Sequence, residues 1–179
     1  MHAGQKYKQI KNIDMKRKIL TLLMIALCTV TYAQQAYDEN IDPIQQIDKA
    51  VSAAKASKKN VICQVGGNWC PWCLRLIDHI AADSLLSKTI DDNYIYIHVN
   101  YNPRKKSDNI SSRQAGVLMK RLGQPSRFGF PVLVVLNAEG NVIHTQDSSF
   151  LEEGNGYDSK KIMRFLKNWT PASINHQNL

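Results

Sequence analysis

Two cysteines that could carry redox chemistry stand in the run Trp69-Cys70-Pro71-Trp72-Cys73, at the start of a predicted helix. The sulfur of the first cysteine meets the unpaired N–H groups and the positive end of the helix dipole, which favour its thiolate. The second cysteine lies on the same side of the helix and can close a ring through a mixed disulfide. The spacing therefore favours thiol–disulfide exchange in which Cys70 attacks and Cys73 resolves the mixed disulfide.

The residues beside the cysteines fit this chemistry. Pro71 suits the first turn of a helix, where its missing N–H costs nothing. Trp72 would place a broad apolar surface beside the sulfur for a partner chain to touch. Trp69 could equally brace the loop or contact a substrate. We therefore include Trp69 and Trp72 among the candidate substrate-binding residues.

Two other uses of the same cysteines stay open, a purely structural disulfide and half of a zinc site. Zinc normally needs a second pair of Cys or His ligands, and beyond the predicted N-terminal segment the chain offers only Cys63 and scattered histidines. Haem attachment is excluded because Leu74, and not His, follows Cys73. We predict no metal site and no bound cofactor other than the redox-active Cys70–Cys73 pair itself.

The remaining reactive side chains are assigned structural roles. Cys63 alternates with apolar neighbours on a predicted strand, which indicates a buried and inert thiol. His79 lies six residues beyond Cys73, on a different face of the helix. We treat His79, His98 and His144 as structural or surface residues.

Residues 42–58 are predicted to form a helix, because apolar residues recur there at helical spacing and Asp42-Pro43 suits a cap and a first turn. A short apolar strand follows over residues 61–65 and stops at Gly66-Gly67. The helix that carries the dithiol runs from Cys70 to about Ala82. Its apolar positions, which we expect to face inward, are Leu74, Ile77 and Ile80 or Ala81.

The second half alternates between strands and helices. Residues 94–99 are rich in β-branched and aromatic side chains and predict a strand, and a polar loop follows over 102–108. Residues 110–122 are weakly helical. Residues 131–136 and 141–144 predict a hairpin. The last helix, 159–169, has an apolar face made of Ile162, Phe165, Leu166 and Trp169, which we interpret as core.

This order of elements predicts an α/β fold. A parallel strand pair joined by a crossover helix, followed by an antiparallel hairpin and a closing helix, gives a central mixed β-sheet flanked by helices on both faces.

The strand followed by Asn68-Trp69-Cys70-Pro71-Trp72-Cys73 and a helix, with Gly129-Phe130-Pro131-Val132 entering a later hairpin, resembles the thioredoxin superfamily. The resemblance covers nearly all of residues 42–169. Within the superfamily the chain looks most like exported thioredoxin-like proteins related to the C-terminal domain of thiol:disulfide interchange proteins. It implies a thioredoxin-like fold, with residues 34–179 as a single domain.

The resemblance adds two residues to the site. In the superfamily the proline at the place of Pro131 is cis and lies against the active-site sulfurs, and the residue before it pairs with a substrate strand. Phe130 and Pro131 thus become candidate substrate-binding residues. Taken alone, Pro131 would be an ordinary proline at the edge of a strand, since most X-Pro bonds are trans.

The sequence departs from the best-known thioredoxin pattern in three places. Pro-Trp replaces Gly-Pro between the cysteines, and Phe130 stands where thioredoxins often have Thr. Gln64 occupies the place of a buried acid thought to relay a proton to the resolving thiol. Because Gln cannot titrate, proton transfer from Cys73 would need water or another group.

The formal net charge of +8 is concentrated near the start of the chain. Six of the 23 Lys and Arg residues and one of the 15 acidic residues precede residue 34, which leaves 17 basic and 14 acidic residues, or +3, for the rest. The later run Arg104-Lys105-Lys106 is interpreted as a solvated loop. We therefore predict no nucleic-acid partner.

Residues 1–33 are interpreted as an N-terminal extension and a signal peptide. Lys16-Arg17-Lys18 precedes an apolar stretch, and the small residue Ala33 suits cleavage. Translation could start at Met1 or at Met15. A lipoprotein anchor on Cys28 is disfavoured, because bulky Leu27 directly precedes it. We expect an exported, periplasmic protein.

These observations predict a thiol:disulfide oxidoreductase of the cell envelope that reduces protein disulfides through its Cys-Pro-Trp-Cys dithiol. Its partners would be exported proteins with disulfides and a membrane thiol–disulfide electron donor. The alternatives are a disulfide donor or isomerase, and a periplasmic metal-binding module that uses the same cysteines.

Overall fold

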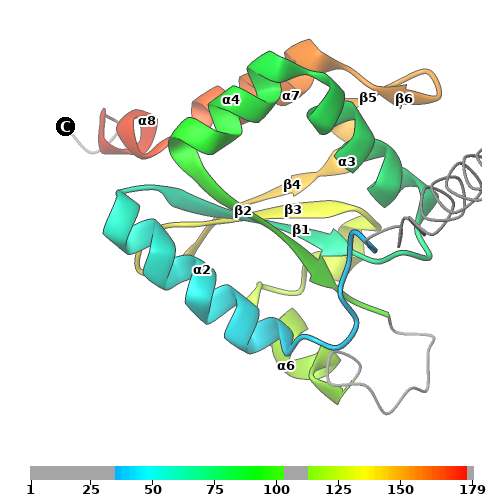
Figure 1. The fold of residues 1–179 in the computed structure, drawn as a ribbon, viewed down its shortest axis with the longest axis vertical. Coiled ribbons are helices and arrows are strands. Elements are labelled where there is room, and N and C mark those ends of the chain that lie inside the picture. The colour runs from blue at the N-terminus through cyan, green and yellow to red at the C-terminus, as the bar shows by residue number, and fades with distance from the viewer. Residues whose placement is uncertain (1–34, 103–112, 177–179) are drawn as a thin grey trace, which may run out of the picture. The chain divides into compact units, whose positions relative to one another are not determined.

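The protein is represented by a computed structural model that describes residues 35–102 and 113–176. The predicted signal peptide, Cys28 and the basic run that begins at Arg104 lie outside these residues. Figure 1 shows the central sheet between two layers of helices.

The sheet has the strand order β2-β1-β3-β4 (Figure 1). β1 (Asn60–Gly66) pairs in parallel with β2 (Tyr94–Asn100) and antiparallel with β3 (Val132–Leu136). β3 also pairs antiparallel with β4 (Val142–Asp147) across the predicted turn. The predicted mixed sheet and its hairpin are therefore confirmed.

Helices cover both faces of the sheet, as predicted (Figure 1). α2 (Pro43–Ser57) and α6 (Ala115–Arg121) pack on one face. α3 (Pro71–Ala82), α4 (Ser84–Asn93) and α7 (Ser159–Asn168) pack on the other. Because each layer buries its own apolar stripe, the sheet has a hydrophobic core on both sides.

The alternation of side chains along β1 decides which layer each residue meets. Val61, Cys63 and Val65 point into the core under α2 and α6. Ile62 points into the opposite core, under α3, α4 and α7. Since successive strand residues face opposite sides, Gln64 faces the same side as Ile62, toward the helix that carries the dithiol.

Local sequence signals account for the start of α2. Asp42 is the N-cap, and its carboxylate accepts hydrogen bonds from the N–H groups of Ile44 at 2.8 Å and Gln45 at 3.3 Å. Pro43 occupies the first turn, where no N–H is required. The helix ends at Lys58, which adopts the left-handed conformation with φ of 56°.

The inward face of α3 differs from the prediction. Leu76 and Cys73 are its buried residues, whereas Leu74 and Ile77 are only partly buried and Ala81 is exposed. Partly buried Ile80 does pack against the core, as expected. The buried face of α3 is rotated relative to the predicted one because Cys73 is one of the residues that face inward.

Several elements are additional to those predicted. Asp83 ends α3 and caps α4, with its carboxylate accepting hydrogen bonds from the first turn of α4. Short 3₁₀ helices occupy Pro125–Phe128 and Ser148–Leu151, and a small hairpin joins β5 (Glu152–Glu153) to β6 (Gly156–Tyr157). A last short helix, α8, spans Pro171–His176.

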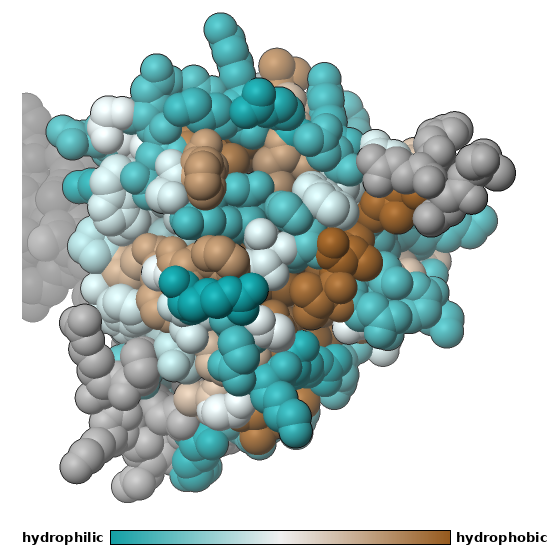
Figure 2. Space-filling model, turned by 180° about the vertical axis from the view of Figure 1, so that it is seen from behind, coloured by the Kyte–Doolittle hydropathy of each residue, from teal (hydrophilic) through white to brown (hydrophobic). Residues whose placement is uncertain are grey.

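Polar and charged side chains cover most of the surface on the side opposite to the view of Figure 1, and apolar side chains reach it in separate patches (Figure 2). None of the helices in the described ranges has the length and apolar character needed to cross a bilayer.

Replacing Asp42 with Ala should remove the cap of α2. The expected cost is about 1 kcal/mol, which lowers Tm by about 2–4 °C in a domain of this size. Asp42→Asn is the matched control, because Asn also caps helices well and should leave Tm nearly unchanged. Equal losses in the two variants, measured by thermal melting, would show that the cap does not stabilise the helix.

Candidate active site

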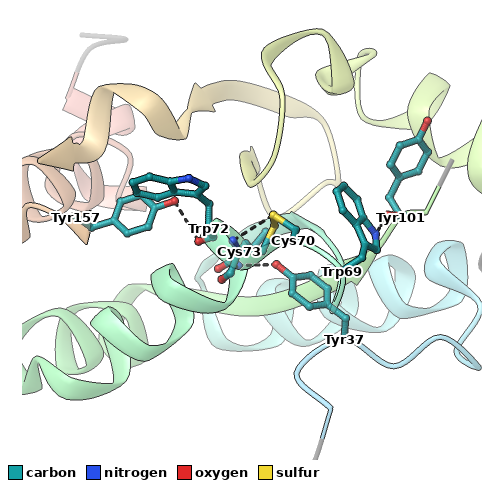
Figure 3. Close-up of a disulfide and its surroundings, with 8 residues drawn as sticks. Tyr37, Trp69, Cys70, Trp72, Cys73, Tyr101 and Tyr157 are labelled. Atoms are coloured by element: carbon teal, nitrogen blue, oxygen red, sulfur yellow. Dashed lines mark hydrogen bonds between the residues drawn. A yellow bond between two sulfur atoms is a disulfide. The ribbon is translucent and has the colours of Figure 1, made fainter. Parts of the chain in front are cut away.

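The dithiol lies at the amino end of α3, as the sequence predicts (Figure 3). Cys70 is the N-cap residue and forms a disulfide with Cys73, with their Cα atoms 5.2 Å apart. The backbone N–H of Cys73 donates a hydrogen bond to Cys70 Sγ at 3.2 Å. In the reduced protein the same donor would stabilise a Cys70 thiolate.

Burial distinguishes the two sulfur-bearing residues. Cys70 is 4% exposed and Cys73 is fully buried. The small part of the pair that reaches the surface therefore belongs to Cys70. This asymmetry agrees with the predicted order of attack.

The end of β1 is shaped to bring the sheet close to the sulfur atoms. A Cβ atom on Gly66 would lie 2.4 Å from Cys73 Sγ, well inside van der Waals contact. A Cβ atom on Gly67 would lie 2.4 Å from the indole Nε1 of Trp69. Only glycines allow the strand to pass this closely, so the pair Gly66-Gly67 positions both the dithiol and Trp69.

One aromatic wall of the site is built around Trp69, which is 39% exposed. Its indole N–H donates to the backbone oxygen of Tyr101 at 3.0 Å (Figure 3). The rings of Trp69 and Phe130 meet edge to face at 5.5 Å, and Phe130 also lies 5.3 Å from the ring of Tyr101. Trp69 thus braces the loop and presents an apolar surface at the same time.

The other aromatic wall is formed by Trp72 and Tyr157, which lie on the opposite side of the disulfide (Figure 3). Their rings meet edge to face at 5.6 Å, and the Tyr157 hydroxyl donates to the backbone oxygen of Trp72 at 3.2 Å. Arg75 lies over the Trp72 ring at 4.8 Å. Its guanidinium gives this wall a positive edge.

Phe130 and Pro131 show one feature that the resemblance implies. The peptide bond between them is cis. Phe130 packs against the cluster of buried residues that contains Cys70 and Cys73, and Pro131 is buried directly before β3. The segment therefore brings the start of β3 to the dithiol.

Gln64 connects the dithiol to two tyrosines. Its side-chain amide donates to the backbone oxygen of Cys73 at 3.0 Å and to the hydroxyl oxygen of Tyr37 at 2.5 Å. The hydroxyl of Tyr96 donates to the amide oxygen of Gln64 at 2.6 Å. The side chain is fully buried, and these three contacts satisfy it.

Tyr37 and Asn68 belong to the site and were not identified from the sequence. Tyr37 is fully buried in a cluster with Cys70 and Cys73, although it precedes α2. Asn68 holds its backbone with two hydrogen bonds, one from the Tyr37 N–H at 3.1 Å and one to the Tyr37 oxygen at 2.7 Å. Asn68 is the first residue of the run that ends at Cys73, so its polar side chain beside the cysteines was the one sequence signal for a role in the site.

Burial sets the protonation of the groups around the dithiol. It raises the pKa of Tyr37 and of Tyr96 well above the usual range, so both phenols keep their protons. It lowers the pKa of His98, whose ring lies 5.5 Å from that of Tyr37. Near neutral pH these groups leave the dithiol without a charged neighbour on this side.

Cys63 is buried on the opposite face of β1 from Gln64, as predicted. It is the free cysteine among the described residues. Burial raises the pKa of its thiol to about 12. The Cys63 thiol therefore stays protonated near neutral pH, and it lies in a different buried cluster from Cys70 and Cys73.

The histidines take part in packing. His79 Nε2 lies 3.0 Å from the hydroxyl of Ser159 at the start of α7. The ring of His144 stacks on Trp169 at 4.2 Å, and burial lowers its pKa. Within residues 35–102 and 113–176, no three His, Cys, Asp or Glu side chains gather in a way that could hold a metal ion.

The mixed sheet with its two helix layers, the dithiol at a helix start and the cis proline define this chain as a member of the thioredoxin superfamily. Its sequence matches, over residues 24–177, the model of the family Thioredox_DsbH, described as "Protein of unknown function, DUF255". The chain belongs to this family. No curated protein matches it in a sequence search.

One solved structure shares the fold, and two others are similar to a lesser degree. A disulphide isomerase from Xylella fastidiosa Temecula1 is 24% identical, with a TM-score of 0.62 over 76% of this chain and 97% of that one. A structure described as DsbH oxidoreductase is 19% identical, with a TM-score of 0.49 over 67% and 78% of the two chains. A thioredoxin from Thermus thermophilus is 15% identical, with a TM-score of 0.45 over 72% and 90%.

Replacing Gly66 with Ala should destabilise the oxidised protein by about 1–3 kcal/mol, because the new methyl group overlaps Cys73 Sγ. Gly116→Ala in α6 is the matched control, since its Cβ would meet no atom within 4 Å. Chemical denaturation of both variants checks the prediction. A Gly66 variant as stable as the Gly116 variant would contradict the close approach.

Cys63 should resist alkylation in the folded protein at pH 8 and react once urea unfolds the chain. The thiolate is the reactive form, so the labelling rate of folded Cys63 should keep rising with pH toward about 12, where its pKa lies. Mass spectrometry after iodoacetamide treatment measures this rate. A plateau near pH 9, the ordinary thiol value, would show that the thiol is not buried.

Proposed function

We propose that this protein is a thiol:disulfide oxidoreductase that reduces disulfides of exported proteins through Cys70 and Cys73. The observation that carries the proposal is the pair at the start of α3, with Cys70 as the capping residue and Cys73 buried behind it. The family to which the chain belongs and its thioredoxin fold support the same chemistry.

The reaction is two successive exchanges. The Cys70 thiolate attacks one sulfur of the client disulfide, a bond forms between Cys70 and that sulfur, and the second client sulfur leaves as a thiolate and takes a proton. The Cys73 thiolate then attacks Cys70 Sγ and releases the first client sulfur. Two electrons pass to the client, and the Cys70–Cys73 disulfide remains.

The two aromatic walls would hold the client during the exchange. Trp69 and Trp72 lie on opposite sides of the disulfide (Figure 3). Phe130 packs against Trp69, so apolar side chains flank the disulfide on both sides and could contact an extended chain. The resemblance to the thioredoxin superfamily suggests that the backbone before Pro131 would pair with such a chain. Aromatic surface of this kind binds many sequences, which suits an enzyme with several clients.

Reduction needs a source of electrons. A membrane thiol–disulfide donor can supply them by the reverse exchange at the Cys70–Cys73 disulfide, with no further cofactor. The signal peptide predicted for residues 1–33 would send the protein to the periplasm, where such a donor would meet it. Anchoring through Cys28 is the less favoured form of the same location.

The direction of transfer follows from the reduction potential of the pair. Equilibrating the mature protein with glutathione buffers and alkylating the free thiols measures it. A value near the roughly −270 mV of thioredoxin supports a reductase, whereas a value near the roughly −120 mV of strong oxidants would identify a disulfide donor.

Serine variants test the order of attack. Cys70→Ser should abolish reduction of a disulfide-bonded client, and Cys73→Ser should trap a mixed disulfide through Cys70, detected on non-reducing gels. Cys63→Ser is the control and should keep most of the activity, because this thiol faces the core under α2 and α6, away from the dithiol. Full activity without Cys70, or loss of activity without Cys63, would overturn the assignment.

A further inference from the structure

Tyr37 lies next to the dithiol, although it belongs to the segment before α2 and to no helix or strand. Both hydrogen-bonding groups of its backbone are engaged by Asn68, two residues before Cys70. Its ring is fully buried and packs in one cluster with Cys70 and Cys73 (Figure 3). A phenol fixed in this way has a defined direction for its O–H group.

The orientation of the Gln64 amide shows where that O–H points. The backbone oxygen of Cys73 can only accept, so the group facing it must be the NH₂ of Gln64. The same NH₂ faces the Tyr37 hydroxyl, whose oxygen therefore accepts. The amide oxygen is accordingly free to accept from Tyr96. Tyr37 thus directs its own proton away from Gln64.

The sulfur of Cys73 and the same hydroxyl both lie close to Gly66. A Cβ atom on Gly66 would be 2.4 Å from Cys73 Sγ and 3.1 Å from the Tyr37 hydroxyl oxygen, so both atoms border one side of this glycine. In the oxidised protein this sulfur is a weak acceptor. After reduction it becomes a thiol or a thiolate, and a thiolate attracts a donor strongly.

We propose that Tyr37 is a positioning residue that donates a hydrogen bond to the Cys73 sulfur of the reduced protein and thereby stabilises the resolving thiolate. This inference rests on the proposed function, since it concerns the second exchange. It compensates in part for the buried acid whose place Gln64 occupies, because it favours the Cys73 thiolate, whereas the proton itself goes to water.

The hydrogen bond stabilises the thiolate without accepting its proton. Burial holds the pKa of Tyr37 well above its usual range, so the phenol remains a donor throughout. In the resolving step Cys73 loses its proton to water, and the released client sulfur takes up a proton. The Cys70–Cys73 bond forms as the bond to the client breaks, so atoms and electrons balance.

The other groups facing this contact come from several elements. Tyr96 and His98 lie on β2, and Tyr157 on β6. Cys70 lies on the same helix as Cys73. Of these, His98 titrates below its ordinary range because of burial, so its titration is separated from that of a buried thiol.

The test measures the pKa of Cys73 in a Cys70→Ser background by ¹³C NMR of labelled cysteine. Tyr37→Phe should raise this pKa by about one pH unit or more, because a donor to the thiolate is lost. Tyr94→Phe is the matched control, since its hydroxyl donates to the backbone oxygen of Leu166, and it should cause no shift. Equal pKa values in the three proteins would overturn the inference.

A second measurement should shift the pKa of Cys73 in the opposite direction. Placing 3-fluorotyrosine at position 37 makes the phenol a stronger donor and adds little volume to its ring, so the pKa of Cys73 should fall. A value unchanged by fluorination would overturn the inference even if Tyr37→Phe folds poorly.

The two proposals fail differently. Normal client reduction together with a Cys73 pKa that does not respond to position 37 would remove the role of Tyr37 only. If the pKa of Cys73 responds to changes at position 37 but the wild-type protein exchanges no disulfide, the proposed function is refuted and the hydrogen bond from Tyr37 is retained.

Discussion

A single buried amide, that of Gln64, connects the three chain segments that meet at the dithiol. It joins Tyr37, the backbone of Cys73 and the hydroxyl of Tyr96. An unsatisfied amide in this core would cost about 1–3 kcal/mol, so each partner is constrained to its position. The dithiol therefore sits on a fixed polar support within otherwise apolar surroundings.

The close approach at Gly66 follows from the same constraint. For the amide to reach the backbone of Cys73, the end of β1 must pass directly beneath the first turn of α3, and a side chain at Gly66 would fill that space. The helix start then offers its free N–H groups to Cys70, while Cys73 is enclosed. The difference in access between the two sulfurs is thus a consequence of strand packing.

The substrate surface is built from residues that are distant in sequence. Trp69 and Trp72 flank the cysteines, but Tyr101 and Tyr157, which orient them, come from the end of β2 and from the small hairpin. The two tryptophans are thereby fixed in different ways, one by its indole N–H and one by its backbone oxygen. A fixed aromatic surface loses little entropy when a client binds.

The dithiol at a helix start, the mixed sheet and the β3–β4 hairpin could be predicted from the sequence, because helical spacing, strand alternation and turn residues are local signals. It did not identify Tyr37, which lies in a short segment without periodicity. The hydrogen bonds of that residue reach 31 positions along the chain to Asn68 and 27 to Gln64. These contacts form only in the folded chain, since they depend on the path by which the segment before α2 crosses the end of β1.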